Sequence, residues 1–133
     1  MQNVFATLLL TSALLVSGCG FSHDEHITGP YRLIAVDIDE QMSVSYDLGD
    51  GSAIGRIEET VFSVGFDKRY IVAMQHPGGD RSKTNYFILD MTKDSKYANP
   101  SESVVGPLSQ TNFEASVKQL NLPVFSRVIK NLK

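Results

Sequence analysis

The chain has 133 residues, a single cysteine and a formal net charge of −3. One cysteine excludes an internal disulfide, so a domain of this size depends on its apolar core for stability. Acidic and basic side chains number nine and two in residues 19–66, five and six in residues 67–108, and one and four in residues 109–133. The acidic first half argues against nucleic-acid binding, which requires a clustered basic face, and suits a protein partner with a basic surface.

Residues 4–16, VFATLLLTSALLV, form an uncharged run of apolar and small side chains. As a helix this run would span about 20 Å, which is too short for the hydrocarbon core of a bilayer, ~30 Å, but typical of a secretory signal. The sequence VSGC follows and ends at Cys19, and it resembles the lipobox of bacterial lipoproteins, in which the cysteine is acylated. We therefore predict a signal peptide over residues 1–18 and a stable lipid anchor on Cys19.

The residue after the lipidated cysteine biases sorting in the lipoproteins that this motif resembles. Gly20 is not the aspartate of their inner-membrane retention signal, which implies an outer-membrane lipoprotein facing the periplasm of a Gram-negative cell. A Gram-positive cell-surface lipoprotein is the alternative. The segment before the apolar run has no Lys or Arg, unlike most export signals. A buried N-terminal helix is the alternative for the run itself, and it would need a large core around it.

Residues 19–30 are predicted to form the lipidated N-terminus and a polar tether, because GFSHDEHITGP is polar and ends in a Gly-Pro turn signal. A single globular domain is predicted over residues 31–133. Apolar and polar side chains alternate over residues 31–38 and 42–48, which predicts two strands joined by a short hairpin connection.

Further strands are expected weakly near residues 54–59 and clearly at 61–66, 70–75 and 85–91. Phe62, Val64 and Phe66 are expected to point inward from the first of these clear strands. Residues 70–75 are apolar on both faces, which predicts a central strand covered on both sides. Because the connections are too short for helical crossovers, these strands are predicted to form an antiparallel meander.

Ser109 is the predicted N-cap of a helix that ends before Pro123. Phe113, Val117 and Leu120 would lie on one face of this helix. The predicted fold class is therefore α+β: an antiparallel β-meander of five to six strands with one C-terminal amphipathic helix, packed on the sheet or closing its edge.

Four stretches of the second half carry a recognisable pattern: GFDKRYIVA at residues 65–73, YFILD at 86–90, GPLS at 106–109 and LNLP at 120–123. Their order and spacing resemble those of a family of small, uncharacterised bacterial lipoproteins. That family implies no particular activity, although some envelope lipoproteins of similar size look like immunity proteins against secreted toxins. Each stretch also has a structural interpretation: a hairpin turn, a close strand approach, or the start of a helix.

The chain lacks the patterns of catalytic and metal sites. His76 is the single histidine of the predicted domain, and its Pro-Gly loop favours a plain loop residue over the base of a hydrolytic triad. We therefore predict no enzyme and no cofactor. His23 and His26 would share a metal only on a helix, so an exposed tether without a metal site is favoured. Asp47 and Asp50 lack the spacing of a calcium loop and are interpreted as turn residues.

Two functions remain from these observations. The first is a non-catalytic protein-binding module in the cell envelope, of which an immunity protein is one version, held at the membrane by acylated Cys19. Its predicted binding surface comprises seven acidic residues: Asp37, Asp39, Glu40, Asp47, Asp50, Glu58 and Glu59. The second function is that of a structural envelope component.

Overall fold

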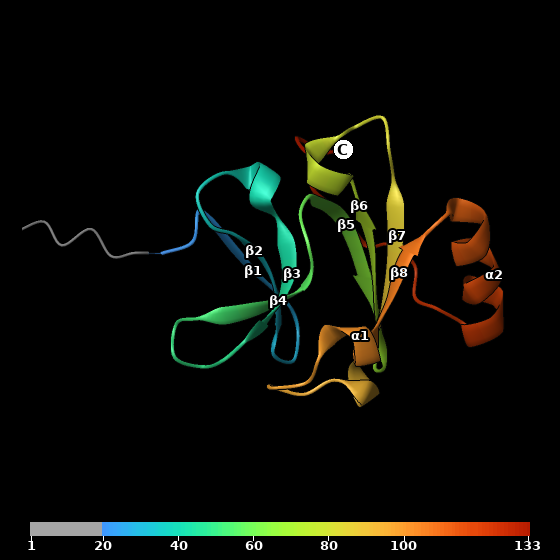
Figure 1. The fold of residues 1–133 in the computed structure, drawn as a ribbon, viewed down its shortest axis with the longest axis horizontal. Helices are drawn as coiled ribbons and strands as arrows, with labels where there is room; N and C mark the ends of the chain where they lie inside the picture. Colours follow the sequence, from blue (N-terminus) through green and yellow to red (C-terminus); the bar gives the residue numbers. More distant parts are fainter. Residues whose placement is uncertain (1–19) are drawn as a thin grey trace, which may run out of the picture.

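The computed structural model describes residues 20–133, so the predicted signal peptide and Cys19 lie outside the described residues. The described chain forms three layers, in which a first sheet packs on a second sheet and a helix covers the far side of the second sheet (Figure 1). The strands are β1 (His23–Thr28), β2 (Tyr31–Ala35), β3 (Ser43–Asp47), β4 (Ala53–Ile57), β5 (Val61–Phe66), β6 (Tyr70–Gln75), β7 (Asn85–Asp90), β8 (Val104–Leu108) and β9 (Arg127–Val128). The helices are α1 (Pro100–Ser103) and α2 (Gln110–Leu120), with short 3₁₀ helices η1 (Asp39–Gln41), η2 (Pro77–Gly79) and η3 (Met91–Lys93).

The first sheet has the order β1-β2-β3-β4, so each strand is antiparallel to the next one along the chain. Leu33 of β2 lies opposite Val44 of β3, and both side chains are fully buried against the second sheet. Arg32 lies opposite Ser45 on the other face. The alternation of apolar and polar residues thus places one face of this sheet in the core, as the sequence predicted.

The first strand corrects the prediction of a tether. β1 pairs with β2 from His23 opposite Ala35 to Thr28 opposite Tyr31, so the prediction of a free polar tether over residues 19–30 is wrong along this strand. β1 is an edge strand, and only Ile27 of its side chains belongs to the core. An edge strand with one solvated face needs few apolar residues, which is why its sequence resembles a linker.

The second sheet has the order β8-β7-β6-β5-β9 and contains the predicted meander of β5, β6 and β7. β6 is confirmed as a central strand covered on both sides. Its Ile71 and Ala73 belong to the core between the sheets, whereas Tyr70 and Val72 pack in a second cluster with Phe113 of α2.

Two details of the second sheet differ from the sequence prediction. Phe66 is 46% exposed, because it ends β5 at the margin of the core and lines a small hollow with Ile27 and Val64. Residues 106–108 belong to β8 rather than to the start of the helix. β8 is the edge strand and pairs only with β7. Pro107 has no N–H group to donate, but at an edge there is no second strand that would need this hydrogen bond.

Helix α2 begins and ends as the sequence predicted. The Ser109 hydroxyl accepts a hydrogen bond from the Asn112 amide at 3.2 Å, which confirms Ser109 as the N-cap. Asn121 has a left-handed backbone, with φ of 52°, and terminates the helix. Phe113 is buried and Val117 packs beside it, whereas Leu120 remains 40% exposed at the end of the helix.

A buried ion pair joins the first sheet to the segment that follows β7. Arg56 Nε of β4 donates to Asp94 Oδ2 at 2.8 Å, and both side chains are fully buried. The Tyr31 hydroxyl donates to the same oxygen at 2.8 Å, and the Arg56 guanidinium also donates to the Ser95 carbonyl at 2.9 Å. Burial and the hydrogen bond to Asp94 both raise the pKa of Tyr31, which therefore stays neutral at physiological pH.

The substitution Asp94→Ala is expected to destabilise the domain by about 3–5 kcal/mol, because it leaves the Arg56 charge buried without a counter-ion. The double substitution Arg56→Met with Asp94→Leu removes both charges and is expected to cost much less. Urea unfolding followed by circular dichroism measures both free energies of unfolding. If both variants lose the same free energy of unfolding, the unpaired Arg56 charge adds no cost beyond the lost packing, which would contradict the prediction.

The substitution Gly65→Ala tests a close approach between β5 and the segment before β9. A Cβ atom on Gly65 would lie 2.0 Å from the Val124 carbonyl oxygen, so the two backbones would have to separate. We expect a loss of about 1–3 kcal/mol, the range typical of overpacking. Gly55→Ala in β4 is the matched control, because a Cβ atom there meets nothing within 4 Å. A neutral Gly65→Ala in the same urea titration would contradict this contact.

Candidate functional site

Five of the seven predicted acidic residues lie at one end of the first sheet. Asp37, Asp39 and Glu40 come from the connection between β2 and β3, and Glu58 and Glu59 from the connection between β4 and β5. Two hydrogen bonds join the two connections. The Thr60 hydroxyl donates to the Glu40 carbonyl, and the Val61 amide donates to the Met42 carbonyl at 2.8 Å. We call these five residues the acidic end.

The acidic end is held by polar contacts that leave several of its charges facing solvent. Asn131 donates to Asp39 Oδ2 at 2.8 Å, and Arg81 Nη2 lies 3.9 Å from Glu40 Oε1. Asp37, Glu58 and Glu59 are exposed and form no ion pair within residues 20–133. These three carboxylates are therefore accessible to a molecule in solution.

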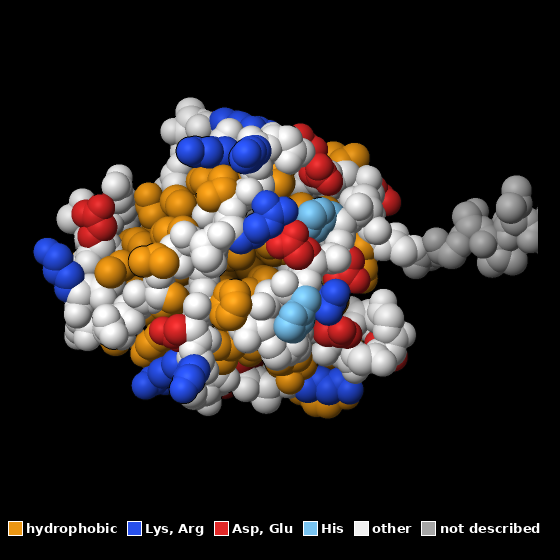
Figure 2. Space-filling view, turned by 180° about the vertical axis from the view of Figure 1, so that it is seen from behind, with side chains coloured by type: hydrophobic (Ala, Val, Ile, Leu, Met, Phe, Trp, Pro, Cys, Tyr) orange, Lys and Arg blue, Asp and Glu red, His pale blue; other side chains and the backbone are white. Residues whose placement is uncertain are grey.

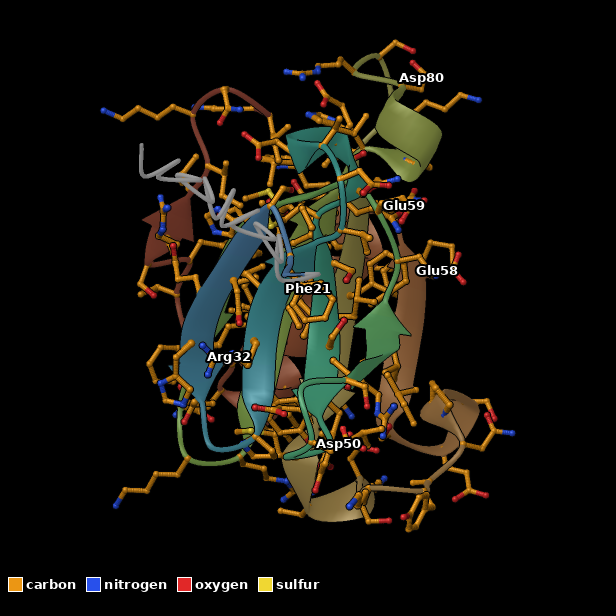
Figure 3. All side chains as sticks on the ribbon, turned by 90° about the vertical axis from the view of Figure 1, so that its left-hand side faces the viewer. Phe21, Arg32, Asp50, Glu58, Glu59 and Asp80 are labelled. Atoms are coloured by element: carbon orange, nitrogen blue, oxygen red, sulfur yellow. The ribbon has the colours of Figure 1, made fainter. Side chains whose placement is uncertain are left out.

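Asp47 and Asp50 do not belong to the acidic end. They flank the turn between β3 and β4, and Figure 3 shows the labelled Asp50 at the opposite end of the molecule from Glu59. Asp47 Oδ1 accepts from the Gly49 amide at 2.8 Å. The Ser52 hydroxyl and amide both donate to Asp50 and lower the pKa of its carboxyl. Both residues thus have the turn role that the sequence favoured.

The outer face of the first sheet carries a hollow that the sequence analysis missed. The hollow has a volume of about 500 Å³, and Phe21, Ile34 and Ala53 contribute to its lining. Figure 3 shows Phe21 lying over the middle of this face. Arg32 and Asp24 form an ion pair at its rim. The sequence feature that indicates this hollow is the apolar Phe21 within a polar stretch. A free tether gives this side chain nothing to pack on, so the prediction of a tether did not lead to the hollow.

An ion pair links the first strand to the last strand. Arg127 of β9 donates to Glu25 of β1 through Nε at 2.9 Å and through Nη2 at 3.0 Å. The hydrogen bond from Arg127 is the main reason that the pKa of Glu25 is lowered. Figure 2 views the molecule from behind: the histidine side chains in view lie on the side away from α2, with several acidic side chains around them.

The three histidines lie in different surroundings and do not gather at one site. His23 and His26 lie three positions apart on β1, so their side chains point to opposite faces and do not converge. Within residues 20–133, no three His, Cys, Asp or Glu side chains come together to hold a metal. His76 was expected as a plain loop residue but is 5% exposed, stacked on Phe62 at 4.1 Å between ring centroids, with Nδ1 2.8 Å from the Lys83 carbonyl oxygen.

Residues 28–127 match a family described as a protein of unknown function, DUF3997. The chain belongs to this family. The match covers more than half of the chain and begins at the last residue of β1, so most of β1 precedes it. No curated protein and no solved structure matches the chain. The predicted membership of an uncharacterised family is therefore shown, whereas lipidation of Cys19 stays a prediction.

The stretches that suggested a family resemblance lie within the DUF3997 match and have structural roles. Asp67 Oδ1 accepts from the amides of Arg69 and Tyr70 at 2.8 and 2.7 Å, which closes the hairpin between β5 and β6. The Arg69 guanidinium pairs with Asp90 at 2.9 Å. Burial alone would raise the pKa of Asp90, but hydrogen bonds from Arg69 and Thr92 outweigh it and hold the pKa below its ordinary value.

A further cleft of about 200 Å³ separates α2 from the second sheet beside this ion pair. Arg69 and Lys93 line it together with Asp90 and Glu102, so cations and carboxylates are balanced. The cleft therefore has no excess charge with which to select an ionic ligand.

Within residues 20–133, no helix is both long enough and apolar enough to cross a membrane.

The pair between Glu25 and Arg127 is expected to make stability depend on pH below the ordinary pKa of a glutamate. Because folding lowers the pKa of Glu25, its contribution is present above the unfolded pKa and is lost as pH falls through the folded pKa. Both side chains are partly exposed, so the effect is at most about 1 kcal/mol. Glu25→Gln should flatten this part of the stability profile, measured by thermal unfolding from pH 7 to pH 3.

Glu102→Gln on α1 is the control for this experiment. It removes the same charge from an exposed carboxylate that forms no ion pair within residues 20–133. If both variants keep the acid slope of the native chain, Glu25 does not contribute to it.

Proposed function

We propose that this DUF3997 chain is a bacterial lipoprotein, anchored by acylated Cys19, whose domain is a non-catalytic protein-binding module of the cell envelope. The observation that carries the proposal is the gathering of five carboxylates from two separate connections at one end of the first sheet. Gly20 after the cysteine supports the outer membrane, facing the periplasm, as the location. An immunity protein against a secreted toxin is one concrete version of this function.

The charge distribution supports a basic protein as the partner. Asp37, Glu58 and Glu59 form no ion pair within the described chain, so their field is not cancelled by a neighbouring cation. Clustered exposed charge of one sign accelerates the encounter with a partner of opposite sign and orients it during approach. The rigid connections that hold these residues reduce the ordering cost of binding.

The placement of His76 supports binding rather than hydrolysis. A catalytic base must reach the proton that it removes, directly or through one water. The His76 ring is buried beneath the surface and stacked on Phe62, and one of its nitrogens lies within hydrogen-bond distance of a backbone carbonyl. This histidine therefore contributes to packing at the end of β6.

Lipidation is tested by the substitution Cys19→Ala. The native chain expressed in a Gram-negative host is expected to incorporate labelled palmitate and to sediment with the outer membrane. The variant should lose both properties, because only the Cys19 sulfur can carry the lipid in a chain with one cysteine. Mass spectrometry of the native product should begin at Cys19. Unlabelled native chain that retains residues 1–18 would contradict the proposed anchor.

The binding surface is tested by charge reversal at the acidic end. The double substitution Glu58→Lys with Glu59→Lys is expected to slow association with a basic partner on the order of tenfold at low salt. Glu102→Lys with Glu114→Lys is the control, since it changes the net charge equally at exposed positions on α1 and α2. The partner is captured by crosslinking in intact cells and compared between the two variants.

The two outcomes of this capture distinguish the candidate functions. Reduced capture with the Glu58 and Glu59 variant alone supports the acidic end as the binding surface. Equal capture by both variants would remove the acidic end from the proposal. A native chain that is abundant and brings down no specific protein would favour the structural envelope component instead.

A further inference from the structure

The fold begins close to the predicted lipid attachment point. The Ser22 amide donates to the Val36 carbonyl at 2.9 Å, and the Ser22 hydroxyl lies 3.2 Å from the Ala35 carbonyl oxygen, so the chain is already hydrogen-bonded at residue 22, immediately before β1. We infer that the apolar residues Phe21, Val36 and Ile38, which flank the first two strands and are called the anchor face, rest on the surface of the lipid bilayer. The inference depends on the proposed acylation of Cys19.

The length of the connection leaves little freedom for the domain. Ser22 follows Cys19 by three residues, which reach at most about 10–11 Å when fully extended. The headgroup layer alone is about 5–8 Å thick on each side of the hydrocarbon core. A cysteine whose acyl chains lie in that core therefore holds Ser22 within a few ångströms of the headgroups. A domain on a flexible linker would not be restrained in this way.

Apolar side chains beside this starting point are exposed to solvent. Val36 is 53% exposed and Ile38 is 56% exposed, although they lie within three residues of the end of a buried strand. Phe21 and Val36 both line a second open hollow, which has a volume of about 520 Å³. Apolar side chains that lie next to a lipid anchor gain free energy by entering the interfacial region, where an amphipathic surface binds by its buried apolar area.

The charges around the anchor face indicate the kind of lipid surface. Asp37 is exposed beside Val36, whereas Asp39 contacts Asn131 and Glu40 faces Arg81. On the outer face of the sheet, Arg32 and Asp24 neutralise each other. The net negative charge of this region would be repelled by a strongly anionic membrane, so the occupant that fits is a zwitterionic bilayer surface.

Two exposed apolar residues beside α2 lie too far from residue 20 to take the place of the anchor face. Leu120 and Val105 lie beside the cleft between α2 and the second sheet. Figure 1 shows α2 on the far side of the second sheet from the first sheet, so this cleft points away from residue 20. The short connection after Cys19 therefore favours the anchor face over the side of the molecule that carries α2.

The test uses fluorescence, because the chain contains no tryptophan. Ile38→Trp and Val36→Trp each place one reporter on the anchor face, and Leu120→Trp places the control on α2, at a position that is also partly exposed. The acylated, full mature chain is reconstituted into phosphatidylcholine vesicles with and without brominated acyl chains. We expect bromine quenching and a blue shift for the reporters at 36 and 38, and neither effect for the reporter at 120.

The outcomes separate this inference from the anchor itself. Vesicle sedimentation and mass spectrometry of the same samples report whether the chain is acylated and bound. A bound, acylated chain whose reporters at 36 and 38 are unquenched, or are quenched no more than the reporter at 120, would overturn the anchor face and leave the lipoprotein proposal intact. Absence of acylation on Cys19 would overturn the proposed function and this inference with it.

Discussion

The buried contact between Arg56 and Asp94 fixes how the two sheets of this domain sit on each other. Nearly every strand pairing joins neighbours in the sequence, so each sheet is specified locally, and the packing between the sheets must be specified separately. The apolar core supplies most of the favourable free energy of that packing, but apolar surfaces tolerate sliding. An ion pair removed from water requires one geometry, because any other arrangement leaves a buried charge without a partner.

A second polar contact closes the opposite side of the fold. Glu25 and Arg127 join β1 and β9, which are the edge strands of the two sheets and lie 102 positions apart in the chain. The first strand is therefore held by a partner from the end of the chain as well as by β2. This explains how β1, with little apolar surface of its own, is part of the folded domain.

The sequence predicted the elements whose side chains alternate and failed where the signal is not local. Alternation identified β2, β3 and β5, apolar runs identified β6 and β7, and the Ser109 cap identified the start of α2. The apolar residues on both faces of β6 predicted that this strand is covered on both sides, but the periodicity does not show that the strands divide into two sheets. The acidic residues were identified as a group, yet their separation into two ends depends on the direction of the β3–β4 hairpin. No local sequence pattern indicates that Arg56 pairs with Asp94.

The acidic end and the anchor face are neighbours, and their arrangement constrains how a partner would approach. Asp37 lies between Val36 and Ile38, so a domain resting on its anchor face would hold this carboxylate at the lipid surface. Glu58 and Glu59 come from the β4 side of the first sheet, and Figure 3 shows them lateral to Phe21 rather than over it. They would remain exposed to solvent above the membrane. A basic partner that approaches from solution would then meet these two carboxylates on the side of the domain, and the attraction between opposite charges would orient it during approach.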